Sequence, residues 1–232
     1  MIRFLLLTCL STLSCLPKNV AQTSLDKSEG LTEKASILDK QDRPTAVTGT
    51  QVPWVENAGQ WREDVLYYAP TFTGNIIINK DKEVLYALPV DSTSGYVLKE
   101  RFVGETKPYS DEFPQGEKRE VTRFNYFMGN DKSAWQTNVP AYEALHMGEI
   151  LEGVNVKLWA HHHNVEKLFY LAPHIDPSAI QMQIEGAEQL QLAPDGRLVV
   201  GTPAGKLFYS APIAYQWMDG KKRLVNVAYQ IN

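Results

Sequence analysis

The sequence predicts an all-β fold, either an antiparallel β-sandwich-like domain or a pair of packed sheets. Short segments rich in β-branched and aromatic residues recur along residues 52–232, and turn signals separate them at intervals of roughly 8–12 residues. The best helical candidate is residues 140–151, and no segment shows an amphipathic pattern longer than two turns. Because helices do not alternate with the strands, a doubly wound α/β fold is disfavoured.

Strands are predicted first in the region after residue 52. Residues 65–69 form a short apolar and aromatic segment that ends before a proline. Residues 76–78 and 83–88 flank a polar turn, and this pattern predicts a hairpin. Residues 96–103 form the next candidate, and residues 119–127 alternate between two faces.

The second half continues in the same way. Proline and glycine in Pro194-Asp195-Gly196 predict a turn, because proline fixes φ and glycine tolerates positive φ. Asp219-Gly220 predicts another turn. The strands expected in this half are residues 154–159, 165–171, 180–185, 190–192, 198–200, 207–209, 213–217 and 224–231.

The composition excludes several classes of protein. The 232 residues are 44% hydrophobic, 22% charged and 10% aromatic, which supplies enough apolar content for a core and excludes a wholly disordered chain. The 23 basic and 27 acidic residues give a net charge of −4, so we expect no nucleic-acid partner. No apolar run reaches the ~18 residues of a spanning helix, so we expect no transmembrane segment after signal cleavage.

Residues 1–21 predict a secretory signal peptide. Arg3 supplies a positive start, residues 4–16 are mostly apolar, Pro17 interrupts them, and Ala21 precedes a cleavage site at Gln22. We therefore expect a protein that is secreted or exposed at the cell surface.

Both cysteines, Cys9 and Cys15, lie within this segment. Cleavage after Ala21 would remove every thiol that could form a disulfide, act as a nucleophile or bind a metal. In the alternative interpretation Cys15 becomes the lipid-modified N-terminus of a lipoprotein. Ser14 fits that pattern, whereas Thr12 does not.

The rest of the chain divides into a spacer and a globular domain. Residues 22–51 are polar and contain no aromatic residue, which predicts a flexible spacer. Residues 52–232 are expected to form the all-β domain. Two lobes, about residues 52–145 and 146–232, are an alternative arrangement of that domain.

Three consecutive histidines, His161-His162-His163, suggest a metal site. Alternation along a strand places His161 and His163 on one face, where two imidazoles could bind a transition metal. Glu166 and His174 are the nearest further ligands in the sequence. Because structural and catalytic metal sites use three or four ligands, we favour an exposed polar turn and expect no cofactor.

Four residues near the start of the domain, Glu56, Asn57, Gln60 and Trp61, suggest a sugar site. An indole can stack on a sugar ring while amides and a carboxylate bind its hydroxyls. The alternative is a capping loop whose amides bind backbone groups at a sheet edge, and we favour that alternative.

Catalysis finds less support in the sequence. Acidic residues are plentiful enough for a glycoside hydrolase, but no pair stands out. The chain contains no Gly-x-Ser-x-Gly elbow, phosphate-binding glycine loop or zinc-protease motif. A hydrolase with acidic catalysis therefore stays the third hypothesis, behind a non-enzymatic module and a carbohydrate-binding module that uses exposed aromatic residues.

Several motifs carry a family resemblance. They are Val55-Glu56-Asn57-Ala58-Gly59-Gln60-Trp61, Asn125-Tyr126-Phe127-Met128-Gly129-Asn130-Asp131, Asp176-Pro177, Glu185-Gly186-Ala187 and Ala211-Pro212-Ile213-Ala214-Tyr215-Gln216. With these motifs the chain resembles the uncharacterised secreted N-terminal domain that precedes SBBP-type β-propeller repeats in bacterial cell-surface, gliding-motility-associated proteins.

The resemblance implies a function without implying a catalytic residue. It implies a non-enzymatic module that supports surface assembly, adhesion or presentation of a neighbouring β-propeller. The partner would be a protein of the cell envelope or extracellular space, or a glycan. Proteins of this kind continue with a further strand, so the apolar strand expected at residues 224–231 would lack a neighbour, and edge-strand self-association is expected.

Overall fold

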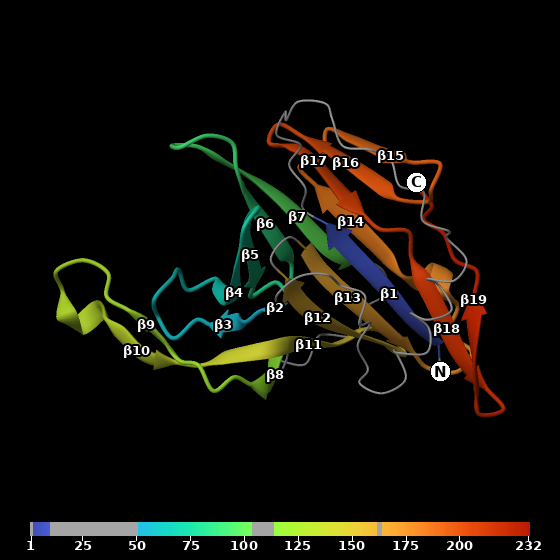
Figure 1. The fold of residues 1–232 in the computed structure, drawn as a ribbon, viewed down its shortest axis with the longest axis horizontal. Coiled ribbons are helices and arrows are strands. Elements are labelled where there is room, and N and C mark those ends of the chain that lie inside the picture. The colour runs from blue at the N-terminus through green and yellow to red at the C-terminus, as the bar shows by residue number, and fades with distance from the viewer. Residues whose placement is uncertain (1, 10–50, 104–113, 162–163) are drawn as a thin grey trace, which may run out of the picture. The chain divides into compact units, whose positions relative to one another are not determined.

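The computed structural model describes residues 2–9, 51–103, 114–161 and 164–232. These residues belong to one compact unit of antiparallel strands, so the predicted all-β, sandwich-like fold is confirmed (Figure 1). The expected spacer lies outside the described residues, except for Gln51.

Nineteen strands and two short 3-10 helices make up the described part of the chain. In chain order they are β1 Ile2–Cys9, β2 Gln51–Val52, β3 Trp54–Glu56, β4 Val65–Thr71, β5 Gly74–Asn79, β6 Val84–Pro89, β7 Gly95–Val103, β8 Gln115–Arg119, β9 Phe124–Tyr126, η1 Lys132–Ala134, β10 Gln136–Val139, β11 Ala141–Leu151, β12 Val154–His161, β13 Asn164–Leu171, η2 Pro177–Ala179, β14 Gln181–Glu185, β15 Gln189–Leu192, β16 Leu198–Thr202, β17 Gly205–Tyr209, β18 Ile213–Met218 and β19 Lys221–Val225.

Strands β4 to β7 form a meander of successive hairpins. The predicted β5–β6 hairpin is confirmed, with Ile76 opposite Tyr86 and Ile78 opposite Val84. Burial alternates along β5, because side chains two residues apart share a face of the sheet. Strand β7 then pairs with β14, and β2 pairs with β12, so the strands of the two expected lobes hydrogen-bond to each other.

Residues 141–151 form a strand, so the helical prediction for residues 140–151 is wrong. Strand β11 pairs with β12, β8 and β3, so its backbone groups are satisfied by neighbouring strands. The register shifts between His146 and Gly148, where Gly148 has a φ of 80°. This irregularity interrupts the alternation of apolar residues, and an interrupted alternation is hard to tell from a weak helical pattern.

The strand predicted at residues 119–127 is split in two. Strand β8 pairs with β11 in the large sheet, whereas β9 pairs with β10 in a separate two-stranded sheet. Between them Val121 is 95% exposed. The single predicted strand is therefore wrong, because its two ends serve different sheets.

The last predicted strand is also shorter than expected. The Asp219-Gly220 turn is confirmed, and both residues have positive φ, as a two-residue hairpin turn requires. Strand β19 ends at Val225, and residues 226–232 leave the sheet. The Tyr229 hydroxyl donates to the Ser210 carbonyl over 2.8 Å, and its ring packs against the core. Burial of this ring therefore replaces the strand pairing that the alternation predicts.

Strand β1 has no counterpart in the sequence predictions. It lies within the expected signal peptide, and it pairs antiparallel with β13 from Ile2 opposite Leu171 to Cys9 opposite Asn164. Its other edge pairs with β18 and with the end of β17. Strand β1, drawn in dark blue in Figure 1, thus occupies an inner position between β13 and β18.

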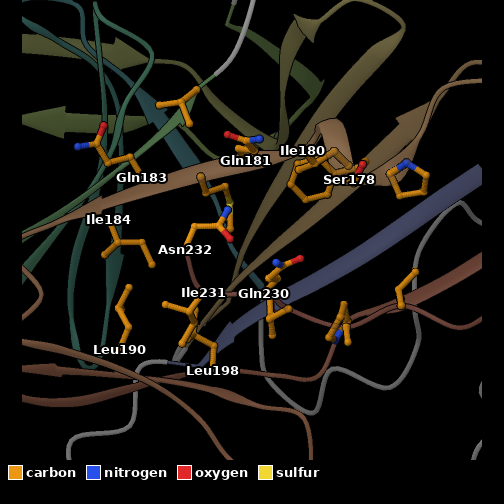
Figure 2. A pocket seen from close by; sticks show the side chains of 18 residues that line it. Ser178, Ile180, Gln181, Gln183, Ile184, Leu190, Leu198, Gln230, Ile231 and Asn232 are labelled. Atoms are coloured by element: carbon orange, nitrogen blue, oxygen red, sulfur yellow. The ribbon is translucent and has the colours of Figure 1, made fainter.

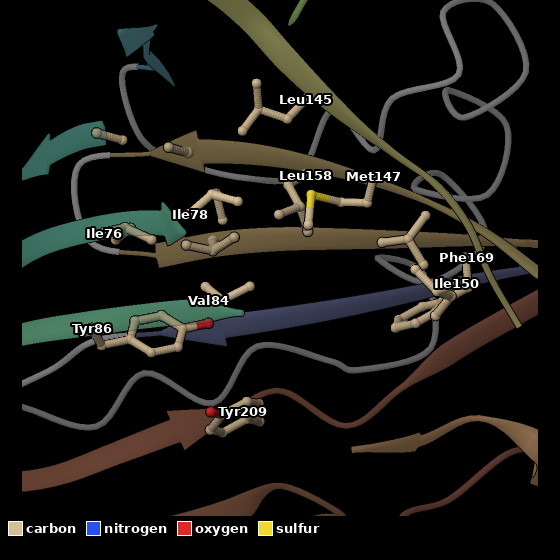
Figure 3. Close-up of a cluster of buried hydrophobic side chains, with 14 of the residues drawn as sticks. Ile76, Ile78, Val84, Tyr86, Leu145, Met147, Ile150, Leu158, Phe169 and Tyr209 are labelled. Carbon is tan, nitrogen blue, oxygen red and sulfur yellow. The ribbon is translucent and has the colours of Figure 1, made fainter. Parts of the chain in front are cut away.

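The core lies between the packed strands (Figure 3). Ile76, Ile78 and Tyr86 come from the β5–β6 hairpin, and Phe169 and Tyr209 come from the second half; all are buried. Each fully buried side chain of this size contributes about 1.5–3 kcal/mol. The two halves of the chain therefore share one core.

Candidate ligand-binding cleft

A cleft of about 650 Å³ lies beside β14 (Figure 2). Its walls come from η2 and β14, from single residues of β7, β13, β15 and β16, and from the C-terminal segment. The lining residues are Val103, Phe169, Pro177, Ser178, Ile180, Gln181, Met182, Gln183, Ile184, Leu190, Leu198, Pro212, Val227, Ala228, Tyr229, Gln230, Ile231 and Asn232. We call this site the β14 cleft.

The lining of the β14 cleft is apolar and amide-bearing. Ile184, Leu190 and Ile231 supply apolar surface, and Gln183 and Asn232 supply amides. Among the described residues that line it, no side chain is an acid, a lysine, an arginine or a histidine. A volume of this size matches the clefts that hold small molecules or short segments of chain.

The backbone edges beside the cleft are open among the described strands. Strand β14 pairs with β7, and no second partner of β14 is described. Strand β15 pairs with β16 and carries four exposed side chains. An open strand edge can bind an extended peptide through backbone hydrogen bonds.

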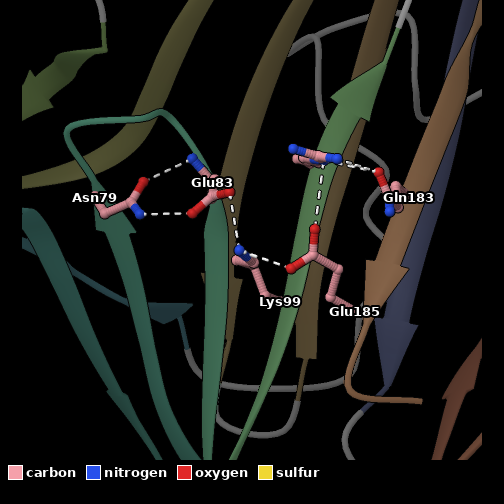
Figure 4. A network of polar contacts seen from close by, with 6 residues as sticks. Asn79, Glu83, Lys99, Gln183 and Glu185 are labelled. Atoms are coloured by element: carbon pink, nitrogen blue, oxygen red, sulfur yellow. Dashed lines mark hydrogen bonds and ion pairs between the residues drawn. The ribbon is translucent and has the colours of Figure 1, made fainter. Parts of the chain in front are cut away.

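A polar network fixes β14 against β7 (Figure 4). The Lys99 ammonium lies 2.7 Å from a Glu185 carboxylate oxygen and 3.3 Å from Glu83. Arg101 donates from Nε to the Gln183 amide oxygen over 2.8 Å. These contacts raise the pKa of Lys99, mainly through Glu185, and the same ammonium lowers the pKa of Glu185. The network positions Gln183 at the cleft wall.

A buried charged cluster lies in the core next to the cleft residues. Lys167 of β13 is fully buried, and its ammonium lies 2.9 Å from a carboxylate oxygen of Glu100 on β7. The hydroxyls of Tyr86 and Tyr209 both donate to the Glu100 carboxylate. Lys167 also donates to the Tyr86 hydroxyl over 2.9 Å. Hydrogen bonds thus satisfy both buried charges.

Burial shifts the acid–base behaviour of this cluster. It lowers the pKa of Lys167, although Glu100 opposes that change. It raises the pKa of Tyr209 well above its usual value, and the Glu100 charge adds to this effect. The pKa of Tyr229, which lines the cleft, is raised for the same two reasons. These tyrosines therefore stay neutral donors in the folded protein.

The predicted sugar-site residues are brought together in one loop after β3. The Asn57 side chain donates to the carbonyls of Arg62 and Val65, both over 2.8 Å, and accepts from the Trp61 backbone. Gln60 donates to the Glu56 carbonyl over 2.6 Å and accepts from a backbone N–H. Both amides are thus engaged within the loop, as a capping role requires.

The remaining two residues of that set contact aromatic neighbours. A Glu56 carboxylate oxygen accepts from the Tyr142 hydroxyl over 2.9 Å. Trp61 packs against Tyr68 at 4.5 Å and against the edge of Tyr126 at 5.3 Å between ring centroids. The indole therefore anchors the β9–β10 sheet to the β3–β4 region.

The predicted histidine site is only partly described, since His163 lies outside the described residues. His161 is buried at the end of β12, and its Nε2 lies 3.3 Å from the Glu166 carboxylate. His174 follows the C-terminal end of β13, whereas His161 precedes its N-terminal end, so the length of β13 separates the two histidines. Within the described residues, no group of three or more His, Cys, Asp or Glu side chains could bind a metal.

Exposed aromatic surface gathers at the tip of the β9–β10 hairpin. Phe127 is 59% exposed and lies edge-on to Trp135, with 5.1 Å between ring centroids. The Lys132 ammonium lies 5.7 Å from the Trp135 ring. Asp131 accepts from the Ser133 backbone and caps η1 in this tip. An exposed aromatic ring beside hydrogen-bond donors is one arrangement that can hold a sugar.

No local sequence pattern predicts the β14 cleft. Its residues come from segments between Val103 and Asn232, and only the fold brings them together. The alternation at residues 180–185 predicts β14, but it does not show that one edge of this strand has no partner among the described strands. The described residues also include no helix long and apolar enough to cross a membrane.

Comparison with known proteins gives a family. The chain belongs to the family described as Domain of unknown function (DUF7948), whose model matches residues 54–232. This match covers most of the chain, from β3 to the last residue. No curated protein and no solved structure matches the chain.

Proposed function

We propose that this member of the DUF7948 family is an exported, non-enzymatic module that acts at the cell surface. Its role would be surface assembly, adhesion or presentation of a neighbouring β-propeller. The observation that supports this proposal is the β14 cleft, where the described lining side chains are uncharged and one edge of β14 has no partner among the described strands. Such a site suits an extended, uncharged segment of a cell-envelope or extracellular protein.

Substitution in the cleft tests this function. Leu190→Asp and Ile231→Asp place a charge in the uncharged cleft at side chains that are 36% and 41% exposed, so folding should be retained. We expect both variants to be exported normally but to be lost from washed cells into the medium. Leu224→Asp is the matched control, because Leu224 is 61% exposed on β19 and does not line the cleft. Equal retention of all variants would contradict a role for the cleft.

Export itself has a direct measurement. If residues 1–21 are a signal peptide, mass spectrometry of the protein outside the cytoplasm should give a chain that begins at Gln22. A lipid-modified chain that begins at Cys15 would support the lipoprotein alternative. A chain with its original Met1 would contradict cleavage.

A carbohydrate-binding module is the second candidate, and the exposed aromatic tip of β9–β10 favours it. Removal of the ring by Phe127→Ala should then weaken or abolish binding to surface polysaccharide, and the variant should be retarded less in affinity electrophoresis. Phe72→Ala is the control, because Phe72 is 73% exposed in a different hairpin. Identical mobility of both variants and the original protein would contradict this candidate.

The hydrolase alternative needs two carboxylates that face a common space. The described residues that line the β14 cleft include no carboxylate side chain. That alternative therefore has to rely on acids elsewhere in the chain.

A further inference from the structure

Strand β1 holds an inner place in the sheet, and it is made of residues that export would remove. Eight residue pairs join it to β13, and four join it to β18, from Ile2 opposite Gln216 to Leu5 opposite Ile213. All eight residues of β1 lie within the expected signal peptide, residues 1–21. The same residues cannot both be cleaved off and fill this place.

Removal of β1 would expose two strand edges that face each other. Strand β13 pairs with β12 on its other edge, and β18 pairs with β19 on its other edge. In antiparallel pairing about half of the residues of each strand direct their N–H and C=O groups toward one neighbour. These groups need new partners, because unpaired backbone groups inside a sheet are costly.

The place left by β1 lies within an apolar part of the structure. Every residue of β13 is buried, and Ala214 and Tyr215 of β18 are buried as well. A strand in this place therefore needs apolar side chains along most of its length. Strand β1 meets this requirement with Ile2, Phe4, Leu5, Leu6, Leu7 and Cys9.

We propose that, in the exported chain, the slot between β13 and β18 binds an apolar β-strand of about eight residues from a partner polypeptide, antiparallel to β13. This inference rests on the proposed export and cleavage. The slot is distinct from the β14 cleft, since it is bounded by β13 and β18 and takes a strand with backbone pairing on both sides.

Two segments within residues 22–232 fit the slot between β13 and β18 poorly. Residues 22–51 are polar and contain no aromatic residue. The apolar segment after β19 is held elsewhere by Tyr229, whose ring packs against the core and whose hydroxyl binds Ser210. Neither segment has the composition of β1, so we assign the slot to a strand of a partner polypeptide.

The test compares two forms of the full chain. One is exported and processed, and the other is made in the cytoplasm and keeps residues 1–21. The probe is a peptide with the β1 sequence, with Cys9→Ser and a lysine tail for solubility. The control peptide is N-methylated at Leu5 and Leu6, which blocks one N–H toward each neighbouring strand and keeps the side chains.

We expect the β1 peptide to bind the processed chain and to raise its Tm by about 5–10 °C at saturation. Hydrogen exchange should slow at residues 164–171 and 213–216. The methylated peptide should have neither effect. The unprocessed chain should not bind the peptide, because its own β1 fills the slot.

Other outcomes would overturn the inference and show which proposal failed. The processed chain could already protect these amides from exchange and bind no peptide. That result would mean that the slot closes without a partner, while export and cleavage would stand. A stable dimer with the same protection would assign the slot to a second copy. An exported chain that keeps Met1 would contradict cleavage itself and leave the slot filled by β1.

Discussion

At the scale of single residues, the carboxylate of Glu100 organises the centre of the core. It accepts hydrogen bonds from Tyr86, Tyr209 and Lys167, which lie on three other strands. The Lys167 ammonium also lies 5.1 Å from the centre of the Tyr209 ring. Because the two opposite charges lie together in the core, loss of one removes a close partner of the other.

A double-mutant cycle tests this coupling. Lys167→Met alone, or Glu100→Leu alone, should lower the free energy of unfolding by about 3–5 kcal/mol, because each removes the opposite charge of a buried ion pair. The double variant should lose clearly less than the sum of the two. Urea unfolding gives the three values. Additive losses would mean that the two side chains act independently.

Alkaline pH should weaken the fold through its buried tyrosines. Burial raises the pKa of Tyr67 to about 12, and the pKa values of Tyr209 and Tyr229 are raised too. The folded state then holds protons that the unfolded state releases, so this stabilisation is complete below about pH 10 and is lost as the pH rises toward 12. Urea unfolding between pH 8 and 11.5 should show the decline. Tyr67→Phe should make it shallower, and an unchanged slope would contradict the role of Tyr67.

At the scale of elements, tight turns decide where hairpins form. Gly74 begins β5 with a φ of 145°, and a Cβ there would meet the Ala87 carbonyl of β6. Gly205 begins β17 with a φ of 116°, and a Cβ there would meet nothing within 4 Å. Both glycines have positive φ, but only at Gly74 would a Cβ also clash with the neighbouring strand.

Alanine substitution should separate these two requirements. Gly205→Ala should cost about 1–2 kcal/mol of unfolding free energy, which is the strain of a positive φ alone. Gly74→Ala should cost measurably more, because the methyl group also displaces backbone of the neighbouring strand. Denaturant midpoints measured with a common m-value give the comparison. Equal losses would show that the hairpin relaxes around the methyl group.

Local pattern predicted most strands correctly, and the exceptions have identifiable physical causes. The β5–β6 hairpin and the Asp219-Gly220 turn depend on adjacent residues, so the sequence carries their signals. Strand β11 looks weakly helical alone and becomes a strand through pairing with distant strands. The β14 cleft and the Lys167–Glu100 pair join residues far apart in the chain, and no local pattern encodes such contacts.

At the scale of the whole molecule, backbone pairing and ion pairs join residues 52–145 to residues 146–232. Strand β7 pairs with β14 over five residues, and the ion pairs of Lys99 and Glu185 reinforce that pairing. The Lys167–Glu100 pair joins the same two halves inside the core. Elements that share a core and backbone pairing usually unfold together.

We therefore expect residues 52–145 and 146–232 to unfold in one cooperative transition. Tryptophan fluorescence reports on Trp54, Trp61 and Trp135 in the first half and on Trp159 and Trp217 in the second, and far-UV circular dichroism reports on all strands. The two signals should give the same midpoint, and the calorimetric and van't Hoff enthalpies should agree. Glu185→Lys replaces an attraction to Lys99 with a repulsion, so it should lower the midpoint of both signals equally.

If the lobes were independent, this substitution would give the fluorescence and circular dichroism signals different midpoints. Fluorescence from Trp→Phe variants of either half would then show which lobe unfolds first.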